Sequence, residues 1–478
     1  MRPFEIVFLV LGVLAAICLL TDKWRSLGKL LTALSLSVFA WEVVWEGAHW
    51  QMVPAYVALV VLCIGVLNRS GKPLLRRQLW ICVPALLLLA SSAGLSWMLP
   101  MFRLPKPTGP YPVGTTILYL KDASRVEDAS DISGQPRELM VQLWYPASAS
   151  SNRWARYREP KETNLTSSYQ SEIATNSRLD APVASSGAPF PVIVFNHGWG
   201  SRRTNDTFLT EELASHGYVV ASIDHTYNAK LVAFPDGRQI HGKSGSDVEN
   251  PDGSTPERVK AVWNRELVKQ TADERFVLDR LEAMSLASGT RWYGRLNARL
   301  AGAIGHSFGG SAAVNLCAVD SRVHGAINMD GWFFQAIEAR GPNQPLLFID
   351  TSADYMGLPP NPHGGVGDAL NFSDSAELAA SLRRYGGRVL TLQGAEHDDF
   401  TDQPLVSPFQ RFSHRGAIPA SELETILRTY VLAFFDEALR GREPEVFHSK
   451  AALYPEATLE SWSGEISAGS SPAQIPGK

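Results

Sequence analysis

The segment 305–309 carries the residues GHSFG, which fit the pattern G-x-S-x-G. In this pattern the serine, here Ser307, lies on a sharp turn between a strand and a helix, and its hydroxyl is exposed. Gly305 and Gly309 suit such a turn because side chains at these positions would collide. The start of the following helix favours the negative charge that develops in acyl transfer. The sequence therefore predicts that Ser307 is a nucleophile.

A serine nucleophile needs a histidine base, which follows the serine in enzymes that carry this turn. The histidines after Ser307 are His324, His363, His397, His414 and His448. Only His397 comes directly after a predicted strand, at 388–392, so we predict that His397 is the base. The alternative is that His397 is an ordinary histidine of a surface loop.

The base in turn needs a carboxylate that orients it, and the sequence offers more than one. Asp330 ends a predicted strand at 325–329, whereas Asp354 follows the next strand, at 346–349, with Asp350 nearby. The order of strands alone does not choose between Asp330 and Asp354, and either could be a plain turn residue.

Two backbone N–H groups must stabilise the oxyanion. One is predicted to come from Phe308, directly after the nucleophile. The other is predicted to come from Trp199, in the segment 196–200 (NHGWG) that follows a predicted strand at 192–195. We interpret His197 in this segment as a residue that supports the loop rather than one that reacts.

The elements that must position these residues alternate along the chain. Apolar strands are predicted at 116–119, 139–145, 192–195, 218–223, 300–304, 325–329, 346–349 and 388–392, and helices at 206–216, 256–284 and 308–318. Short buried strands between helices indicate a mostly parallel sheet covered on both faces, which here is the α/β-hydrolase fold. The segments 153–188 and 228–256 are predicted to be loops.

The first hundred residues differ from the rest in being strongly apolar. Apolar runs at 6–20, 30–45, 53–67 and 79–99 predict about four transmembrane helices, with Glu42 the only charge well inside a run. We therefore expect a transmembrane region at 1–103 and a catalytic domain at 104–445. The C-terminal tail at 446–478 is expected to be flexible.

The loops between the apolar runs predict an orientation. Basic residues gather in the first loop (Lys23, Arg25) and the third (Arg69, Lys72, Arg76), which lie on one side of the membrane. The positive-inside rule places that side in the cytoplasm. We expect an integral protein of the cytoplasmic or plasma membrane with its catalytic domain on the extracytoplasmic side.

Composition excludes some classes of function. The chain has 478 residues, a formal net charge of −4 and 19% charged residues, which gives no reason to expect a nucleic-acid partner. Its four cysteines form no disulfide pattern, so they do not indicate whether the protein lies in an oxidising or a reducing compartment. We expect no cofactor and no metal ion, and the oligomeric state is left open.

From about residue 139 to residue 406 the chain resembles the platelet-activating-factor acetylhydrolase family of α/β-hydrolases. The similar segments are 305–310 (GHSFGG), 196–200 (NHGWG), 212–221 (ELASHGYVVA), 224–225 (DH), 329–332 (MDGW) and 394–400 (GAEHDDF). The resemblance implies that Asp330 is the acid. It also implies a calcium-independent esterase that removes short or oxidised acyl chains from phospholipids. The apolar N-terminal region and the segment 228–257 depart from the family pattern.

The hypothesis from sequence is thus a Ser307–His397–Asp330 esterase that acts on a small-molecule or phospholipid ester. Trp332, Phe333 and Phe334 are expected to line an acyl pocket, although aromatic residues after a strand are more often plain core. The rival hypotheses are a broad carboxylesterase or polyester hydrolase, and a membrane-anchored binding module without turnover. A separate transport or scaffolding role of the helices finds little support in a single buried charge.

Overall fold

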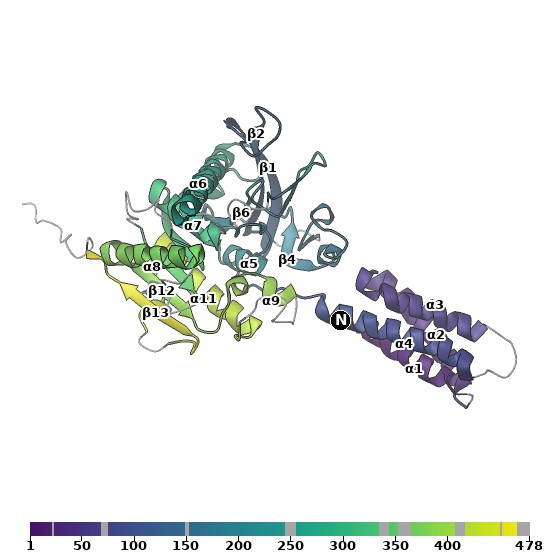
Figure 1. The fold of residues 1–478 in the computed structure, drawn as a ribbon. Coiled ribbons are helices and arrows are strands. Elements are labelled where there is room, and N and C mark those ends of the chain that lie inside the picture. Colours follow the sequence, from purple (N-terminus) through teal and green to yellow (C-terminus); the bar gives the residue numbers. More distant parts are fainter. Residues whose placement is uncertain are drawn as a thin grey trace, which may run out of the picture. The chain divides into compact units, whose positions relative to one another are not determined.

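The computed structural model describes nine ranges of the chain: 1–21, 23–67, 75–148, 153–243, 255–333, 344–351, 365–406, 416–449 and 452–465. The chain divides into two compact units. The first comprises Met1–Arg103, Arg156–Ala174 and Leu405–Ser413, and the second comprises Leu104–Ala155, Thr175–Pro404 and His414–Lys478. Figure 1 shows both units, and each is described here by itself.

The first unit is built around a bundle of apolar helices. Its main helices are α1 (Pro3–Leu19), α2 (Arg25–Trp45), α3 (Val53–Leu67) and α4 (Leu75–Met98), with a short 3₁₀ turn η1 (Trp50–Met52) before α3. Helix α1 packs on α2 and α4, and α3 packs on α4. Small residues such as Ala16 and Ala58 are fully buried between helices, whereas Val44, Leu67 and Leu87 face outward. Outward apolar side chains of this kind suit a lipid environment.

Among the described residues, three helices rather than the predicted four are long and apolar enough to cross a membrane. They are Arg25–Trp45, Trp50–Leu67 and Gln78–Met98, whereas α1 is a shorter apolar helix of 17 residues. At 1.5 Å per residue α1 is about 26 Å long, against a hydrocarbon core of about 30 Å. The loop with Arg69 and Lys72 lies outside the described residues, so the orientation stays a prediction.

Glu42 is not the only buried charge of this unit. Its Oε1 accepts a hydrogen bond from the hydroxyl of Tyr56 at 2.7 Å. Glu5, just before the first apolar run, is also buried and pairs with Arg2, and the Nε2 of His49 lies 3.3 Å from its carboxylate. The helices therefore bring together polar groups that lie far apart in the sequence.

The second unit contains an extended sheet. Its strands are β1 (Val113–Val126), β2 (Pro136–Pro146), β3 (Trp154–Arg156), β4 (Ala174–Leu179), β5 (Phe190–Asn196), β6 (Val219–Asp224), β9 (Leu296–His306), β10 (Val323–Met329), β11 (Leu346–Asp350), β12 (Gly387–Leu392) and β13 (Ala457–Trp462). Among the described residues their order is β13-β12-β11-β10-β9-β5-β6-β2-β1-β4-β3. The six strands from β12 to β6 in this order are parallel, and β2 and β13 pair antiparallel with β6 and β12. The predicted mostly parallel sheet is confirmed.

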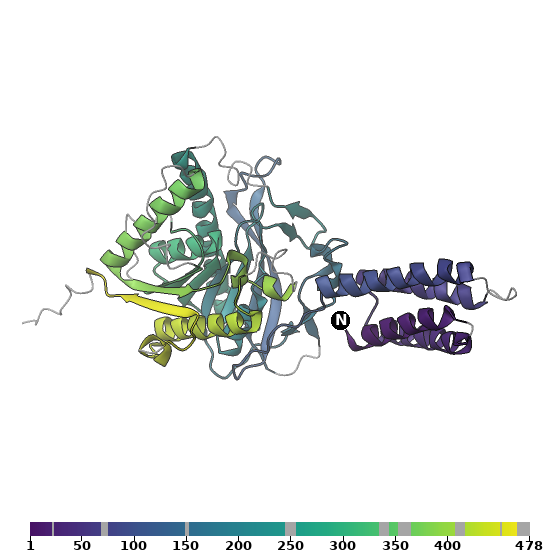
Figure 2. The ribbon, with the colours of Figure 1, turned by 60° about the horizontal axis from the view of Figure 1, so that its bottom comes forward.

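Helices cover both faces of the parallel strands (Figures 1 and 2). They are α5 (Thr207–Ser215), α6 (Pro256–Leu286), α7 (Phe308–Val319), α8 (Val366–Tyr385) and α11 (Ala420–Arg440). The second unit also contains the short turns η6 (His397–Phe400) and η7 (Glu445–Phe447), and α9 (Gln403–Val406) begins in it. The turns η2 (Pro160–Glu162) and η3 (Ser168–Ser171) belong to the first unit. Helices α6, α7 and α8 share one hydrophobic core with the sheet, and α11 packs on β9 and β10. Strands buried on both faces explain the nearly continuous apolar runs in the sequence.

Three segments fold where no regular structure was expected. Strands β3 and β4 lie inside the predicted loop 153–188, and a small hairpin of β7 (Leu231–Ala233) and β8 (Gln239–His241) lies inside the predicted loop 228–256. Strand β13 lies in the segment predicted to be a flexible tail, where it pairs with β12 along the edge of the sheet. These segments are short and partly polar, so pairing with a neighbouring strand decides their structure.

Candidate active site

The turn at Ser307 has the strained geometry that its sequence pattern predicts. Strand β9 ends at His306 and α7 begins at Phe308, and Ser307 between them has φ 54° and ψ −128°. Such a conformation costs an ordinary residue about 1–3 kcal/mol. A Cβ on Gly305 would lie 2.2 Å from the carbonyl oxygen of Gly309, and a Cβ on Gly309 would lie 2.3 Å from that of Asn196. Both glycines are therefore required by close backbone contacts.

Asp330 and His397 are brought together at the carboxyl edge of the sheet. Asp330 directly follows β10, the neighbour of β9, and His397 follows β12. The Nδ1 of His397 and the Oδ2 of Asp330 form a short hydrogen bond. The other carboxylate oxygen of Asp330 accepts hydrogen bonds from the amide (3.3 Å) and the hydroxyl (3.2 Å) of Thr351. Asp330 itself has φ 53°, a second strained position within the site.

The pKa values of this pair follow from their contact. Burial favours the neutral form of Asp330, but the hydrogen bond and charge of His397 outweigh it and hold the pKa of Asp330 below its usual value. Burial lowers the pKa of His397, but the hydrogen bond and charge of Asp330 raise it by more, so the net shift is upward. The pair thus favours an ionised Asp330 and a more basic His397.

The side chain of His306 contacts the main chain of His397. Its Nε2 lies 2.8 Å from the carbonyl oxygen of His397, and the two ring centroids are 4.6 Å apart. Burial, together with the nearby His397, lowers the pKa of His306 to about 3, so its ring is neutral. A neutral ring with its hydrogen on Nε2 donates to this carbonyl.

The loop after β5 approaches Ser307 closely. A Cβ on Gly198 would lie 3.1 Å from the Cβ of Ser307. Burial lowers the pKa of His197 to about 4, so this ring is neutral; its Nε2 accepts from the amide of His225 at 3.4 Å, and its Nδ1 lies 2.7 Å from the oxygen of Gly198. Since C=O and N–H point in opposite directions across a trans peptide, this contact fixes the direction of the Trp199 N–H.

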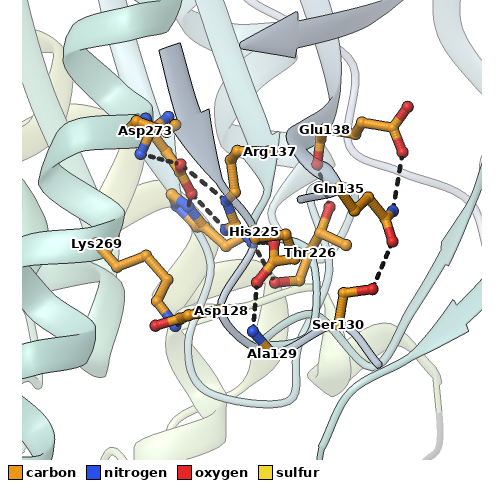
Figure 3. Close-up of polar contacts among 12 residues, drawn as sticks. Asp128, Ala129, Ser130, Gln135, Arg137, Glu138, His225, Thr226, Lys269 and Asp273 are labelled. Atoms are coloured by element: carbon orange, nitrogen blue, oxygen red, sulfur yellow. Dashed lines mark hydrogen bonds and ion pairs between the residues drawn. The ribbon is translucent and has the colours of Figure 1, made fainter. Parts of the chain in front are cut away.

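A buried network of Arg137, His225 and Asp273 lies next to Asn196, the residue that ends β5 and leads into this loop. Figure 3 shows the contacts among the three network residues. His225 lies between Asn196, 3.1 Å from its Nε2, and Asp273 of α6, 2.9 Å from its Nδ1. Asp273 also accepts two hydrogen bonds from Arg137, at 3.1 and 2.6 Å. Burial raises the pKa of Asp273, but the charge and hydrogen bonds of Arg137, with the hydrogen bond from His225, outweigh it and hold this pKa far below its usual value. The ends of β5 and β6 are thereby tied to α6.

A cavity of about 390 Å³ opens beside Ser307. Its lining residues are Trp263, Ser307, Phe308, Ser311, Asp330, Gly331, Trp332, Asp350, Thr351, Asn371 and His397. Three of the lining side chains are aromatic, namely Trp263, Phe308 and Trp332. The rings of Trp263 and Phe308 are 4.8 Å apart. This volume suits a small ligand rather than a whole phospholipid. Among the described residues, no group of three or more His, Cys, Asp or Glu side chains is arranged to hold a metal ion.

The aromatic residues that were expected to line an acyl pocket lie in different surroundings. Trp332 lines the cavity, and its indole N–H donates to Asn371 at 2.9 Å. Phe333 instead lies in the core, where its ring packs on Phe348, and its expected contact with substrate stays a prediction. The amide of Phe333 donates a hydrogen bond to Asp374 at 2.6 Å. Phe334 lies outside the described residues.

The predicted oxyanion residues lie beside the cavity. Phe308 lines it, and the ring of Trp199 packs edge-on against Phe308 at 5.6 Å. Their roles as donors stay predictions. Of the alternative acids, Asp350 lines the cavity without contacting His397, and Asp354 lies outside the described residues.

Several cavity residues were not found from the sequence. Trp263 comes from the N-terminal part of α6, Asn371 from α8 and Ser311 from the first turns of α7. None of them belongs to a short motif. The single tryptophan in the helix predicted at 256–284 was the available signal.

Comparison with known proteins agrees with this geometry. The sequence pattern of platelet-activating factor acetylhydrolase, isoform II, matches residues 98–246 and 290–446, which is more than half of the chain. The chain belongs to this family. The resemblance seen in the sequence is therefore confirmed, and the chain is a member of a family of serine esterases.

Individual relatives are distant but match over most of their length. The probable 1-alkyl-2-acetylglycerophosphocholine esterase of Arthroderma benhamiae is 24% identical over 402 residues, which cover 75% of this chain and 94% of that protein. The platelet-activating factor acetylhydrolase of Cavia porcellus is 25% identical over 375 residues, covering 70% and 78%. A solved structure of a ferulic acid esterase from Streptomyces cinnamoneus is 33% identical, with a TM-score of 0.60, and covers 75% of this chain and 99% of that one.

Proposed function

We propose that this acetylhydrolase-family protein is a serine ester hydrolase that removes short or oxidised acyl groups from phospholipid-like esters. Ser307 is the nucleophile, His397 the general base and Asp330 the acid that orients it. The hydrogen bond between Asp330 and His397, at the rim of the cavity that Ser307 also lines, carries the proposal. It joins an acid that follows β10 to a histidine that follows β12, which is the pair that a serine nucleophile needs.

The reaction follows from these positions in two steps. His397 takes the proton of the Ser307 hydroxyl while its oxygen attacks the ester carbonyl, and the alcohol leaves with that proton. Water then attacks the acyl-enzyme, gives a proton to His397, and releases the carboxylic acid as the proton returns to Ser307. In both steps the amides of Phe308 and Trp199 donate to the oxyanion.

The substrate class is supported by the size of the cavity and by the relatives. A cavity of about 390 Å³ suits a short acyl chain together with part of the alcohol. Two relatives are named for the hydrolysis of 2-acetyl phospholipids. The three apolar helices would keep such an enzyme next to amphiphilic substrates. By the positive-inside rule, the catalytic unit is on the extracytoplasmic side.

A second candidate function is hydrolysis of esters of aromatic acids. Trp263, Phe308 and Trp332 line the cavity and offer flat apolar surfaces to a ring. The ferulic acid esterase is also more similar in sequence than the two acetylhydrolases described above. A broad carboxylesterase or polyester hydrolase would use the same residues.

The test uses the full chain, purified in detergent, beside Ser307→Ala. Hydrolysis is measured for p-nitrophenyl acetate, butyrate and octanoate, for methyl ferulate, and for phospholipids with an acetyl or a palmitoyl group at the sn-2 position. We expect the rate to fall as the acyl chain lengthens, a strong preference for the sn-2 acetyl phospholipid, and loss of all activity in the variant.

Other outcomes select the alternatives. A preference for methyl ferulate over every acyl ester would favour the aromatic-ester enzyme. Absence of hydrolysis by a chain whose circular dichroism is that of a folded protein would favour a binding module and exclude the esterase.

A further inference from the structure

Asp350 lies in the candidate active site but takes no part in the proposed mechanism. It ends β11, which pairs in parallel with β10, and the amide of Asp330 donates to the carbonyl of Ile349 at 2.8 Å. Asp330 and Asp350 therefore extend from neighbouring strand ends. Both side chains line the cavity beside Ser307.

Unlike the side chains of Asp330 and Asp374, the side chain of Asp350 has no hydrogen-bond or ion-pair partner among the described residues. Asp330 is engaged by His397 and Thr351, and Asp374 accepts the amide of Phe333. Asp350 is only 6% exposed, and its Oδ2 is buried without a hydrogen bond. Buried polar atoms are almost always paired in folded proteins, so an unpaired one on a cavity wall points to a ligand as its partner.

The surroundings of Asp350 favour its uncharged form. Burial raises its pKa well above the usual value, and the neighbouring charges of Asp330 and Asp374 raise it further. A neutral carboxylic acid offers one O–H donor and one carbonyl acceptor. It is therefore complementary to a group that can both accept and donate.

We propose that Asp350 forms a subsite for an uncharged hydroxyl group on the ester substrate. A hydroxyl can accept from the acid O–H and donate to its carbonyl, whereas an anionic group would be repelled by the ionised Asp330. The subsite rests on the proposed esterase function and adds a substrate class to it, namely esters that carry an alcohol or phenol hydroxyl near the scissile bond. Trp263 and Trp332 line the same cavity and can cover the apolar part of such a group.

The test compares matched ester pairs that differ only by a hydroxyl. Methyl 2-hydroxycinnamate is compared with methyl cinnamate, and p-nitrophenyl 3-hydroxybutyrate with p-nitrophenyl butyrate, using the full chain in detergent. For at least one pair we expect kcat/KM of the wild type to favour the hydroxylated ester about tenfold, the size of one well-placed hydrogen-bonding group. Asp350→Leu should bring this ratio to about one, and Asp350→Asn should keep part of it because an amide also donates and accepts.

Glu211→Gln is the matched control, since it changes another buried acid whose pKa is raised by burial and which is not among the described residues that line the cavity. This control should retain the ratio of the wild type. A wild-type ratio near one for both pairs, or an Asp350→Leu variant that keeps the ratio, would overturn the subsite.

Binding to Ser307→Ala separates the subsite from the proposed function. Tryptophan fluorescence, with Trp263 and Trp332 on the cavity wall, reports binding of the four esters without turnover. If the wild type hydrolyses none of them but Ser307→Ala binds the hydroxylated esters more tightly, and Asp350→Leu removes that preference, the subsite stands and the esterase proposal fails. Equal binding within each pair would overturn the subsite whether or not hydrolysis is found.

Discussion

The ring of His306 holds the main chain of His397. The contact joins its Nε2 to the carbonyl oxygen of His397 at 2.8 Å, with the rings 4.6 Å apart. His306 occupies the position before the nucleophile where the G-x-S-x-G pattern allows any residue. Here it has a specific function, because it fixes the loop on which the proposed base lies. The short turn η6, which begins at His397, leaves this residue half exposed, so the contact from His306 is its support from the protein interior.

His306→Phe keeps a ring of similar size but removes the hydrogen bond. We expect kcat on p-nitrophenyl acetate to fall about tenfold with little change in KM, because binding is retained while the base is less well positioned. A melting temperature near that of the wild type would separate this effect from loss of the fold. An unchanged kcat would show that the loop of His397 is held without His306.

Asp330→Asn should alter both the rate and its dependence on pH. The base acts when neutral, so kcat/KM of the wild type should rise with pH through a pKa above the usual 6.5 of histidine. Without the charge of Asp330 that pKa falls, so the inflection should move to lower pH while the plateau drops by about 10³–10⁴-fold. Stopped-flow or plate assays from pH 4 to 9 measure both quantities. A variant with full activity would assign the acid elsewhere, with Asp354 as the next candidate.

Gly309→Ala should destabilise the catalytic unit. Its Cβ would lie 2.3 Å from the carbonyl oxygen of Asn196, and backbone atoms cannot move aside cheaply, so a loss of about 1–3 kcal/mol is expected. Gly367→Ala in α8 is the control, since an added Cβ there meets no atom within 4 Å and alanine favours a helix. Thermal unfolding of both variants should show a lower melting temperature only for the first. Equal stability of the two would contradict the close approach at the turn.

Asp273→Asn should be destabilising. It removes one of the two carboxylates that pair with the buried Arg137 and leaves Glu127 as the other, so a loss of about 1.5–3 kcal/mol is expected. Because the pKa of Asp273 is depressed in the folded state, its stabilisation is present at neutral pH and is lost as pH falls below the usual value of 3.8. Chemical denaturation at pH 7 and pH 2.5 tests both points. Asp236→Asn, at an exposed pair with Arg238, should change stability little.

The membrane proposal predicts an integral protein with an exposed catalytic unit. After cell fractionation the full chain should remain in the membrane pellet through washing at high pH, because three apolar helices do not leave lipid. Protease added to intact spheroplasts should then digest the catalytic unit, as the positive-inside rule predicts. Protection of that unit until the membrane is broken would reverse the orientation.

The sequence by itself determined the parts that local chemistry dictates. The turn at Ser307, the buried strands that lead to it and the helix after it follow from periodicity, glycine positions and one short motif. Apolar composition likewise predicted the N-terminal helices, although length limits the candidates for membrane spans to three. The resemblance to a known family, rather than spacing, favoured Asp330 over Asp354.

The tertiary structure decided what depends on pairing between distant segments. The contact of Asp330 with His397 spans 67 positions, and the neighbouring, unpaired Asp350 differs from Asp330 only in what surrounds it. Trp332 and Phe333 are adjacent aromatic residues, yet one lines the cavity and the other is core. Strand β13 forms because β12 leaves an edge for it. Composition carries no signal for these outcomes, because burial and hydrogen-bond partners are set by the whole fold.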